Sequence, residues 1–310
     1  MSAREGPRPN LFLIGVQRSA TTAMWTYLSK HPEIFMAPKE LHYFGADLGH
    51  CAPGTDGGPR ISLEQYLKKF EGSGDRPYRG DASVGYIYSA TAAREILEFA
   101  PDARIVASFR NPIDMTYSVY GLLSFQGMEP ARDYATAFAD DALRWAYTNG
   151  QFKWCFTYRR LVAYTEQLER YLETFGPERV HVVVYEDLAE DTGGVYGELL
   201  RFLGVDDEFR PELPVVWANR QVRSDVLQRF LWESPAALRR VVRAVLPNPA
   251  TRRRLGARLA ERNKEVAPRQ EISPALRRRL EEELSGEVER FSSLVGRDLR
   301  ARWFGDAVQP

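Results

Sequence analysis

The sequence lacks both a long hydrophobic run near its N-terminus and a rich set of cysteines. Its longest apolar run there, Leu11 to Val16, is far shorter than the roughly 20 residues that a membrane-spanning helix needs. The layout of a secretory signal is also missing, so we expect a cytoplasmic protein without an integral membrane segment. Cys51 and Cys155 are the only cysteines, and they predict neither a disulfide framework nor a zinc site.

Net charge is absent as well, because 42 lysines and arginines balance 42 acidic residues. Basic residues interleaved with aromatic ones, typical of nucleic-acid-binding surfaces, are not found, so no nucleic-acid partner is predicted. The composition, 44% hydrophobic and 27% charged, is that of an ordinary globular protein. We expect one domain over residues 1–310, with an α/β nucleotide-binding core at 10–190 and a mainly helical flank or lid at 191–310.

Short apolar runs alternate with helix-length amphipathic stretches. The runs predict strands at Leu11–Val16, Tyr78–Ser83, Arg104–Arg110 and Val180–Tyr185. The stretches predict helices at Thr22–Lys30, Ala90–Phe99, Met115–Phe125, Tyr134–Tyr147 and Phe156–Phe175. After Tyr185 the pattern is all-helical, with pieces at Leu199–Phe202, Val226–Trp232, Ala236–Leu246 and Pro274–Val295. This alternation indicates an α/β fold of three layers, a central parallel sheet flanked by helices.

The first predicted strand runs directly into a turn and a helix start, a combination that exposes backbone donors to an anion. The residues of this P-loop-like turn are Gly15, Val16, Gln17, Arg18, Ser19, Ala20, Thr21 and Thr22. The turn has the length of the Walker A pattern, but Ala20 and Thr21 stand where that pattern has glycine and lysine. A nucleoside triphosphate is therefore disfavoured, and Arg18 is the cation expected in place of the lysine.

Two other functions remain open from these residues alone. A small-molecule kinase with Arg18 in place of the lysine would turn over ATP with magnesium. A non-catalytic nucleotide-binding module would bind without turnover. The run from Val182 to Asp187 could imitate a Walker B strand, but Glu186 and Asp187 are better explained as acids at a helix start. No metal is predicted.

Three segments resemble the PAPS-dependent sulfotransferase family, in its carbohydrate-type and bacterial branches. The turn Gly15–Thr22 looks like the family's 5′-phosphosulfate-binding loop, and Ala37–Phe44, which reads APKELHYF, is similar to its Pro-Lys-Glu-x-His-Phe-Phe segment. Arg104–Pro112, continued to Ser118, resembles its 3′-phosphate-binding strand and helix. With weaker matches further on, the resemblance extends from Leu11 to Trp303.

The resemblance implies a fold, a reaction and a set of site residues. The enzyme would transfer the sulfuryl group of 3′-phosphoadenosine-5′-phosphosulfate (PAPS) to a hydroxyl or amine of a small-molecule, glycan or lipid acceptor. The products would be the sulfated acceptor and 3′-phosphoadenosine-5′-phosphate (PAP). The general base would be Glu40, with His42 as the alternative, and Arg18 would hold the leaving phosphate. Residues implied to bind the donor are Gln17, Arg18, Ser19, Ala20, Thr21, Thr22, Arg110, Ser118, Arg262 and Lys264.

Overall fold

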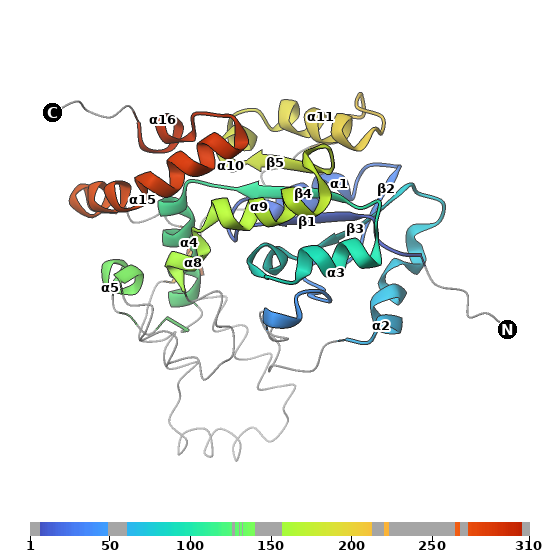
Figure 1. Cartoon of the computed structure of the whole chain (residues 1–310), viewed down its shortest axis with the longest axis horizontal. Coiled ribbons are helices and arrows are strands. Elements are labelled where there is room, and N and C mark those ends of the chain that lie inside the picture. The colour runs from blue at the N-terminus through green and yellow to red at the C-terminus, as the bar shows by residue number, and fades with distance from the viewer. Residues whose placement is uncertain are drawn as a thin grey trace, which may run out of the picture.

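A five-stranded parallel sheet with strand order β2-β3-β1-β4-β5 forms the centre of the molecule (Figure 1). The computed structural model describes residues 7–48, 61–125, 128–129, 131, 133–139, 157–212, 220–222, 264–266 and 272–305. The strands of the sheet are β1 (Leu11–Gly15), β2 (Ile34–Met36), β3 (Tyr78–Ala82), β4 (Arg104–Phe109) and β5 (Val180–Val184). This sheet confirms the predicted α/β class.

Helices cover both faces of the sheet. One face is covered by α1 (Thr21–Leu28), α10 (Tyr185–Glu190) and α11 (Thr192–Leu203). The helices of the other core are α2 (Leu63–Leu67), α3 (Ala92–Phe99), α4 (Pro112–Phe125), α5 (Tyr134–Ala139), α8 (Tyr158–Leu161), α9 (Tyr164–Phe175), α15 (Pro274–Val295) and α16 (Leu299–Phe304). The fold therefore has the three layers that the sequence predicted.

The alternation of side chains along β1 explains why its sequence is apolar throughout. Phe12 and Ile14 pack into the core that contains α3, α9 and α15. Leu11 and Leu13 pack into the opposite core, against α1 and α11. Successive side chains of a strand point to opposite faces, so a strand covered on both faces has no polar positions.

The sequence did not predict β2, which pairs with β3 from Ile34 opposite Tyr78. The expectation of an all-helical region after Tyr185 was wrong, because β6 (Arg220–Val222) and β7 (Lys264–Val266) form an antiparallel pair. All three strands have three residues. Such a length is too short to show the alternation by which a strand is recognised.

The predicted helices compare well with the structure where it describes them. Pro274–Val295 is one helix, whereas the stretch predicted at Phe156–Phe175 contains two, α8 and α9. The predicted helices at Val226–Trp232 and Ala236–Leu246, and both cysteines, lie outside the described residues. Within the described part of the chain, no helix combines the length and the apolar character needed to cross a bilayer.

Candidate active site

The turn after β1 is fixed against the end of β4. Gly15 has a φ of 140°, and a Cβ at this position would lie 2.4 Å from the backbone oxygen of Ser108, so the close approach of the two strands requires glycine. The N–H of Val16 donates to the same oxygen, at 2.8 Å. The Ser108 hydroxyl donates to the Ser19 carbonyl at 2.7 Å, and the Ser19 hydroxyl to the Val16 carbonyl at 2.6 Å. The turn is therefore held in one conformation.

Helix α1 begins at this turn without a side-chain cap. Its N-cap residue is Ala20, in the left-handed conformation with φ 65° and ψ 19°, and its first turn contains no acidic residue. Helix N-termini carry unpaired N–H groups and a partial positive charge, which most helices satisfy with a polar or acidic side chain. The start of α1 is thus suited to bind an anion. Gln17 lies at the edge of this site, where its N–H donates to the Tyr88 hydroxyl at 3.0 Å.

Two arginines meet beside the turn. Arg110, which follows β4, donates from Nη1 to the backbone oxygen of Arg18 at 2.8 Å, and its guanidinium lies 4.2 Å from the ring centroid of Tyr185. Arg18 donates from Nε to the Ser118 hydroxyl on α4 at 2.8 Å. Burial lowers the pKa of Arg18, and the positive charge of Arg110 lowers it further. The three predicted donor-binding residues Arg18, Arg110 and Ser118 therefore form one cluster, called the arginine cluster below.

One donor in the arginine cluster is left without an acceptor. Arg110 Nε is buried and has no hydrogen-bond partner among the described residues. A buried donor left unpaired costs about 1–3 kcal/mol, more when it is charged. An anion bound between Arg110 and Ser118 would satisfy it, and a phosphate fits the planar fork of a guanidinium. The residues present thus fit the 3′-phosphate of the implied donor.

The loop that follows β2 carries the two candidate bases. Glu40 Oε2 accepts the N–H of Val84 at 3.1 Å and lies 3.0 Å from His42 Nε2, although the pair lacks the alignment of a hydrogen bond. Glu40 Oε1 lies 3.6 Å from Lys39 Nζ. The Glu40 side chain is 26% exposed and that of His42 11%. Glu40 is therefore both held in place and the more accessible of the two to an acceptor.

Unusual backbone conformations are found in the same two segments. The described non-glycine residues with positive φ are Arg18 (61°), Ala20 (65°), Glu40 (61°) and His42 (46°). A residue other than glycine in this region typically costs about 1–3 kcal/mol and persists only where its surroundings enforce it. Such residues cluster at active sites. Here they lie in the turn Gly15–Thr22, called the phosphate turn, and in the loop that carries Glu40 and His42, called the base loop.

A buried carboxylate that the sequence analysis missed positions the base loop. Asp81, on β3, is fully buried and accepts hydrogen bonds from the hydroxyls of Tyr66 (2.7 Å), Ser83 (2.7 Å) and Tyr86 (2.8 Å). Burial raises the pKa of Asp81, while these hydrogen bonds oppose the increase. Ser83 Oγ in turn accepts the N–H of His42 at 3.1 Å, and the Tyr86 hydroxyl that of Tyr43 at 2.9 Å. The signal in the sequence was a lone acid within a predicted strand.

The remaining predicted residues lie on the C-terminal part of the chain. Arg262 lies outside the described residues. The backbone of Lys264 is part of β7, whose partner β6 contacts α4, the helix that carries Ser118. The structure therefore brings the backbone at Lys264 to the α4 side of the molecule, and its contact with the donor stays a prediction.

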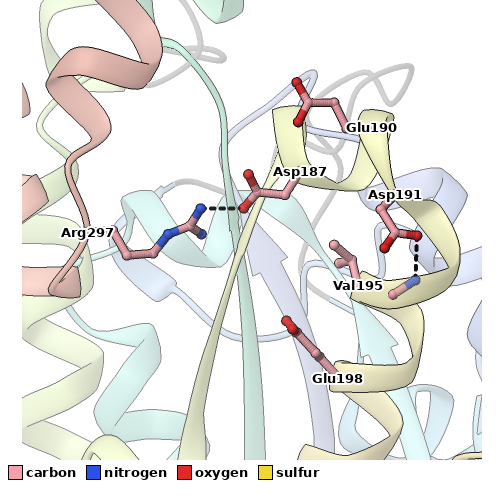
Figure 2. Close-up of a pocket in the computed structure, with 7 residues that line it drawn as sticks. Asp187, Glu190, Asp191, Val195, Glu198 and Arg297 are labelled. Carbon is pink, nitrogen blue, oxygen red and sulfur yellow. Dashed lines mark hydrogen bonds and ion pairs between the residues drawn. The ribbon is translucent and has the colours of Figure 1, made fainter.

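A pocket of about 470 Å³ lies elsewhere, on α10, α11 and the turn after α15 (Figure 2). The residues that line it are Asp187, Glu190, Asp191, Gly194, Val195, Glu198 and Arg297. Arg297 pairs with Asp187 at 2.7 Å, and Asp191 caps α11 by accepting the N–H of Gly194 at 2.8 Å. Four carboxylates repel an anionic ligand, so this pocket does not suit the donor.

Glu186 and Asp187 lie in the first turn of α10, as predicted for acids at a helix start. Glu186 accepts hydrogen bonds from the Asn111 N–H at 3.1 Å and from Trp303 Nε1 at 2.9 Å. The residues that the structure describes contain no group of three or more His, Cys, Asp and Glu side chains that could hold a metal ion. Metal independence of the reaction stays a prediction.

Comparisons with known proteins agree with this geometry. The model of the sulfotransferase family matches residues 86–209. The bifunctional heparan sulfate N-deacetylase/N-sulfotransferase 1 of Caenorhabditis briggsae is 24% identical over 224 residues, which cover 69% of this chain and 24% of that protein. The human heparan sulfate glucosamine 3-O-sulfotransferase 6 is 23% identical over 199 residues, 64% of this chain and 52% of that protein. The chain thus spans about half, or less, of the length of these relatives.

Among solved structures, a sulfotransferase from Alicyclobacillus acidocaldarius superposes with a TM-score of 0.71 at 25% identity. The match covers 96% of this chain and 99% of that one. The family model, the curated relatives and this structure lead to the same conclusion. They support a sulfotransferase family for this chain.

Proposed function

We propose that the chain transfers the sulfuryl group of PAPS to a hydroxyl or amine of an acceptor and releases PAP. The observation that carries this proposal is the arginine cluster beside the uncapped start of α1. Arg110 Nη1 donates to the backbone oxygen of Arg18 at 2.8 Å, and Arg18 Nε donates to the Ser118 hydroxyl at 2.8 Å. A ligand with phosphates at both its 5′ and 3′ ends matches two adjacent anion sites of this kind.

The 5′ end of the donor would bind at the phosphate turn. The N–H groups at the start of α1 and the hydroxyls of Thr21 and Thr22 are the donors available there. The 3′-phosphate would bind Arg110 and Ser118, where it would satisfy the buried Nε of Arg110. A magnesium-dependent kinase is less well supported, because the turn has Thr21 where a triphosphate-binding loop has lysine.

The transfer step is an in-line displacement at sulfur. The acceptor oxygen or nitrogen forms a bond to sulfur, the bond from sulfur to the bridging oxygen breaks, and its electron pair stays on the 5′-phosphate of PAP. The acceptor proton goes to Glu40. A positioned general base contributes typically about 10²–10⁴-fold to such a step.

His42 is the alternative base, and its Nε2 lies 3.0 Å from Glu40 Oε2 without the alignment of a hydrogen bond. Glu40 is favoured because its Oε2 is fixed by the Val84 N–H, and because it is the more exposed of the two. His42 then acts as a neighbour that helps to orient the carboxylate.

The acceptor remains a class rather than a compound. Curated relatives named for heparan sulfate suggest a glycan, and small-molecule and lipid alcohols or amines fit the same chemistry. By the resemblance, however, Met115 and Ala82 stand where many glycan-modifying members carry arginine and lysine, which argues against recognition of a heparan-type acceptor; both are buried. We therefore extend the proposal to hydroxyl and amine acceptors in general.

Calorimetric titration tests the choice of donor. Wild-type protein is titrated with PAP, with AMP, and with ATP in the presence of magnesium. PAP is expected to bind most tightly, because it alone fills both anion sites, and AMP more weakly because it lacks the 3′-phosphate. Preference for ATP with magnesium would contradict the proposal and favour the kinase.

A further inference from the structure

Lys39 lies across the start of α1, although it comes from a different loop. Its Nζ donates to Thr22 Oγ1 at 2.8 Å and to Thr21 Oγ1 at 3.3 Å. The same nitrogen is 3.6 Å from Glu40 Oε1, and the side chain is only 17% exposed. A single ammonium group therefore contacts both the phosphate-binding helix and the candidate base.

The sequence predicted Arg18 as the cation at the leaving phosphate, and that role stays a prediction. Arg18 Nε is bonded to Ser118 at 2.8 Å, on the side of the predicted 3′-phosphate. The cation that contacts the hydroxyls of Thr21 and Thr22, in the first turn of α1, is the ammonium group of Lys39. Thr21 stands where the Walker A pattern has lysine. The ammonium group of Lys39, from the loop after β2, contacts the hydroxyl of Thr21.

The surroundings of Lys39 do not neutralise it fully. Burial lowers the pKa of Lys39, and Glu40 opposes this decrease only in part. Thr21 and Thr22 supply neutral hydroxyl oxygens. A partly buried ammonium group that one carboxylate neutralises only in part gains more from an incoming anion than an exposed one, because the local dielectric is lower.

We propose that Lys39 is a catalytic residue whose ammonium group binds the oxygen that bridges the phosphate and the sulfuryl group of the donor. The inference rests on the proposed function. As the bond from sulfur to this oxygen breaks, the electron pair moves onto the oxygen and its negative charge grows. The hydrogen bond from Lys39 strengthens during the same step, so it stabilises the transition state more than the bound donor.

The position of Lys39 next to Glu40 adds a second consequence. The leaving oxygen and the acceptor lie on opposite sides of sulfur in an in-line displacement. Lys39 on the leaving side and Glu40 on the acceptor side are consecutive residues, and their charged groups are 3.6 Å apart. One short loop, held by the Asp81 network, thereby sets the relative positions of the two groups that act at either end of the reaction.

The test compares Lys39→Met, which removes the charge and keeps the length, with Lys39→Arg, which keeps the charge. Lys30→Met is the matched control, because Lys30 lies beyond the opposite end of α1 and its Nζ contacts the Glu212 carbonyl. Release of PAP from PAPS is measured with water and with a panel of phenols, alcohols and amino sugars as acceptors. Binding of PAP and the thermal midpoint are measured for each variant.

Lys39→Met is expected to lower kcat by about 10²- to 10³-fold, as expected for a lost transition-state donor. Its PAP affinity should fall by less than about tenfold, and its thermal midpoint should stay near that of the wild type. Lys39→Arg should recover part of kcat, and Lys30→Met should behave like the wild type.

Three results would overturn the inference. They are a Lys39→Met variant with wild-type kcat, equal losses of PAP affinity and turnover, or no recovery by arginine together with a lowered thermal midpoint. Each of these leaves wild-type transfer intact and so leaves the proposed function standing. A wild-type protein that releases no PAP from PAPS under any condition would instead contradict the proposed function, and this inference with it.

Discussion

Arg110 donates a hydrogen bond from Nη1 to the backbone oxygen of Arg18 at 2.8 Å, and this bond joins the end of β4 to the phosphate turn. The contact holds two positive charges close together, and the mutual repulsion contributes to the lowered pKa of Arg18. Like charges held in a partly buried site disfavour each other until an anion binds between them. The pair is therefore a recognition element for a strongly anionic ligand.

Replacement of Arg110 tests this element. Arg110→Ala is expected to weaken PAP binding by about 1–3 kcal/mol, because a charged hydrogen bond to the 3′-phosphate is lost. Arg104→Ala is the control, since Arg104 lies at the other end of β4 and its Nη1 contacts the Glu178 carbonyl. Calorimetry with PAP measures both variants. Equal losses of PAP affinity in the two variants would show that Arg110 acts only by stabilising β4.

Ser118 should contribute less, because it offers a neutral hydroxyl. Ser118→Ala removes both the acceptor for Arg18 Nε and the proposed donor to the 3′-phosphate. We expect PAP binding to weaken by about 1 kcal/mol, with AMP binding nearly unchanged. Ser124→Ala, on the exposed side of the same helix, serves as the control. A similar loss of AMP affinity would place Ser118 at the 5′ end instead.

The assignment of the base is tested by a pair of variants. Glu40→Gln keeps an oxygen that can accept the Val84 N–H but cannot take a proton at neutral pH. It should lower the rate of PAP release from PAPS by about 10²–10⁴-fold and leave PAP affinity close to that of the wild type. His42→Gln should retain a rate within about tenfold. The reverse ranking of the two variants would make His42 the base.

Asp47 provides a prediction about stability and pH. Burial alone would raise the pKa of Asp47, but hydrogen bonds from the Ser89 hydroxyl, the Ala90 N–H and the Thr91 hydroxyl lower it. A depressed pKa in the folded state contributes stability above the unfolded value, about 3.9, and this contribution is lost as the pH falls through the folded value. Asp47 thus stabilises the loop after the base segment mainly near neutral pH.

Asp47→Asn is expected to lower the free energy of unfolding by about 0.5 kcal/mol near pH 7, because solvent screens this exposed carboxylate. The difference from the wild type should shrink as the pH falls below about 4. Urea denaturation at several pH values measures it, with the exposed Asp75→Asn as the control. A difference that stays constant with pH would mean that the carboxylate charge plays no part.

The parts of the fold that local patterns determine were predicted well. Helix α15 matched at both ends, because Pro274 lies in its first turn and Gly296, with φ 67°, forms its C-cap. The strands β1, β3, β4 and β5 matched to within one residue: β1, β4 and β5 are mainly apolar, whereas β3 contains Arg79 and Asp81. The short strand β2 gave no such signal.

Contacts between segments that are distant in the chain could not be predicted from the sequence patterns. The turn at Gly15–Thr22 was recognised, yet the direction of Arg18 depends on the neighbouring strand β4 and on α4, which begin far along the chain. Likewise, Asp81 reaches the base loop through Ser83 and Tyr86, and only the strand order brings β3 beside β1. Residue type indicated which groups were available, and topology decided which of them met.

A crystal structure of the protein with PAP tests the central claim most directly. We predict the 5′-phosphate at the start of α1, against the Thr21 and Thr22 hydroxyls, and the 3′-phosphate on Arg110 Nε and Ser118. Density for the nucleotide at any other place, with the turn after β1 free of phosphate, would contradict the account.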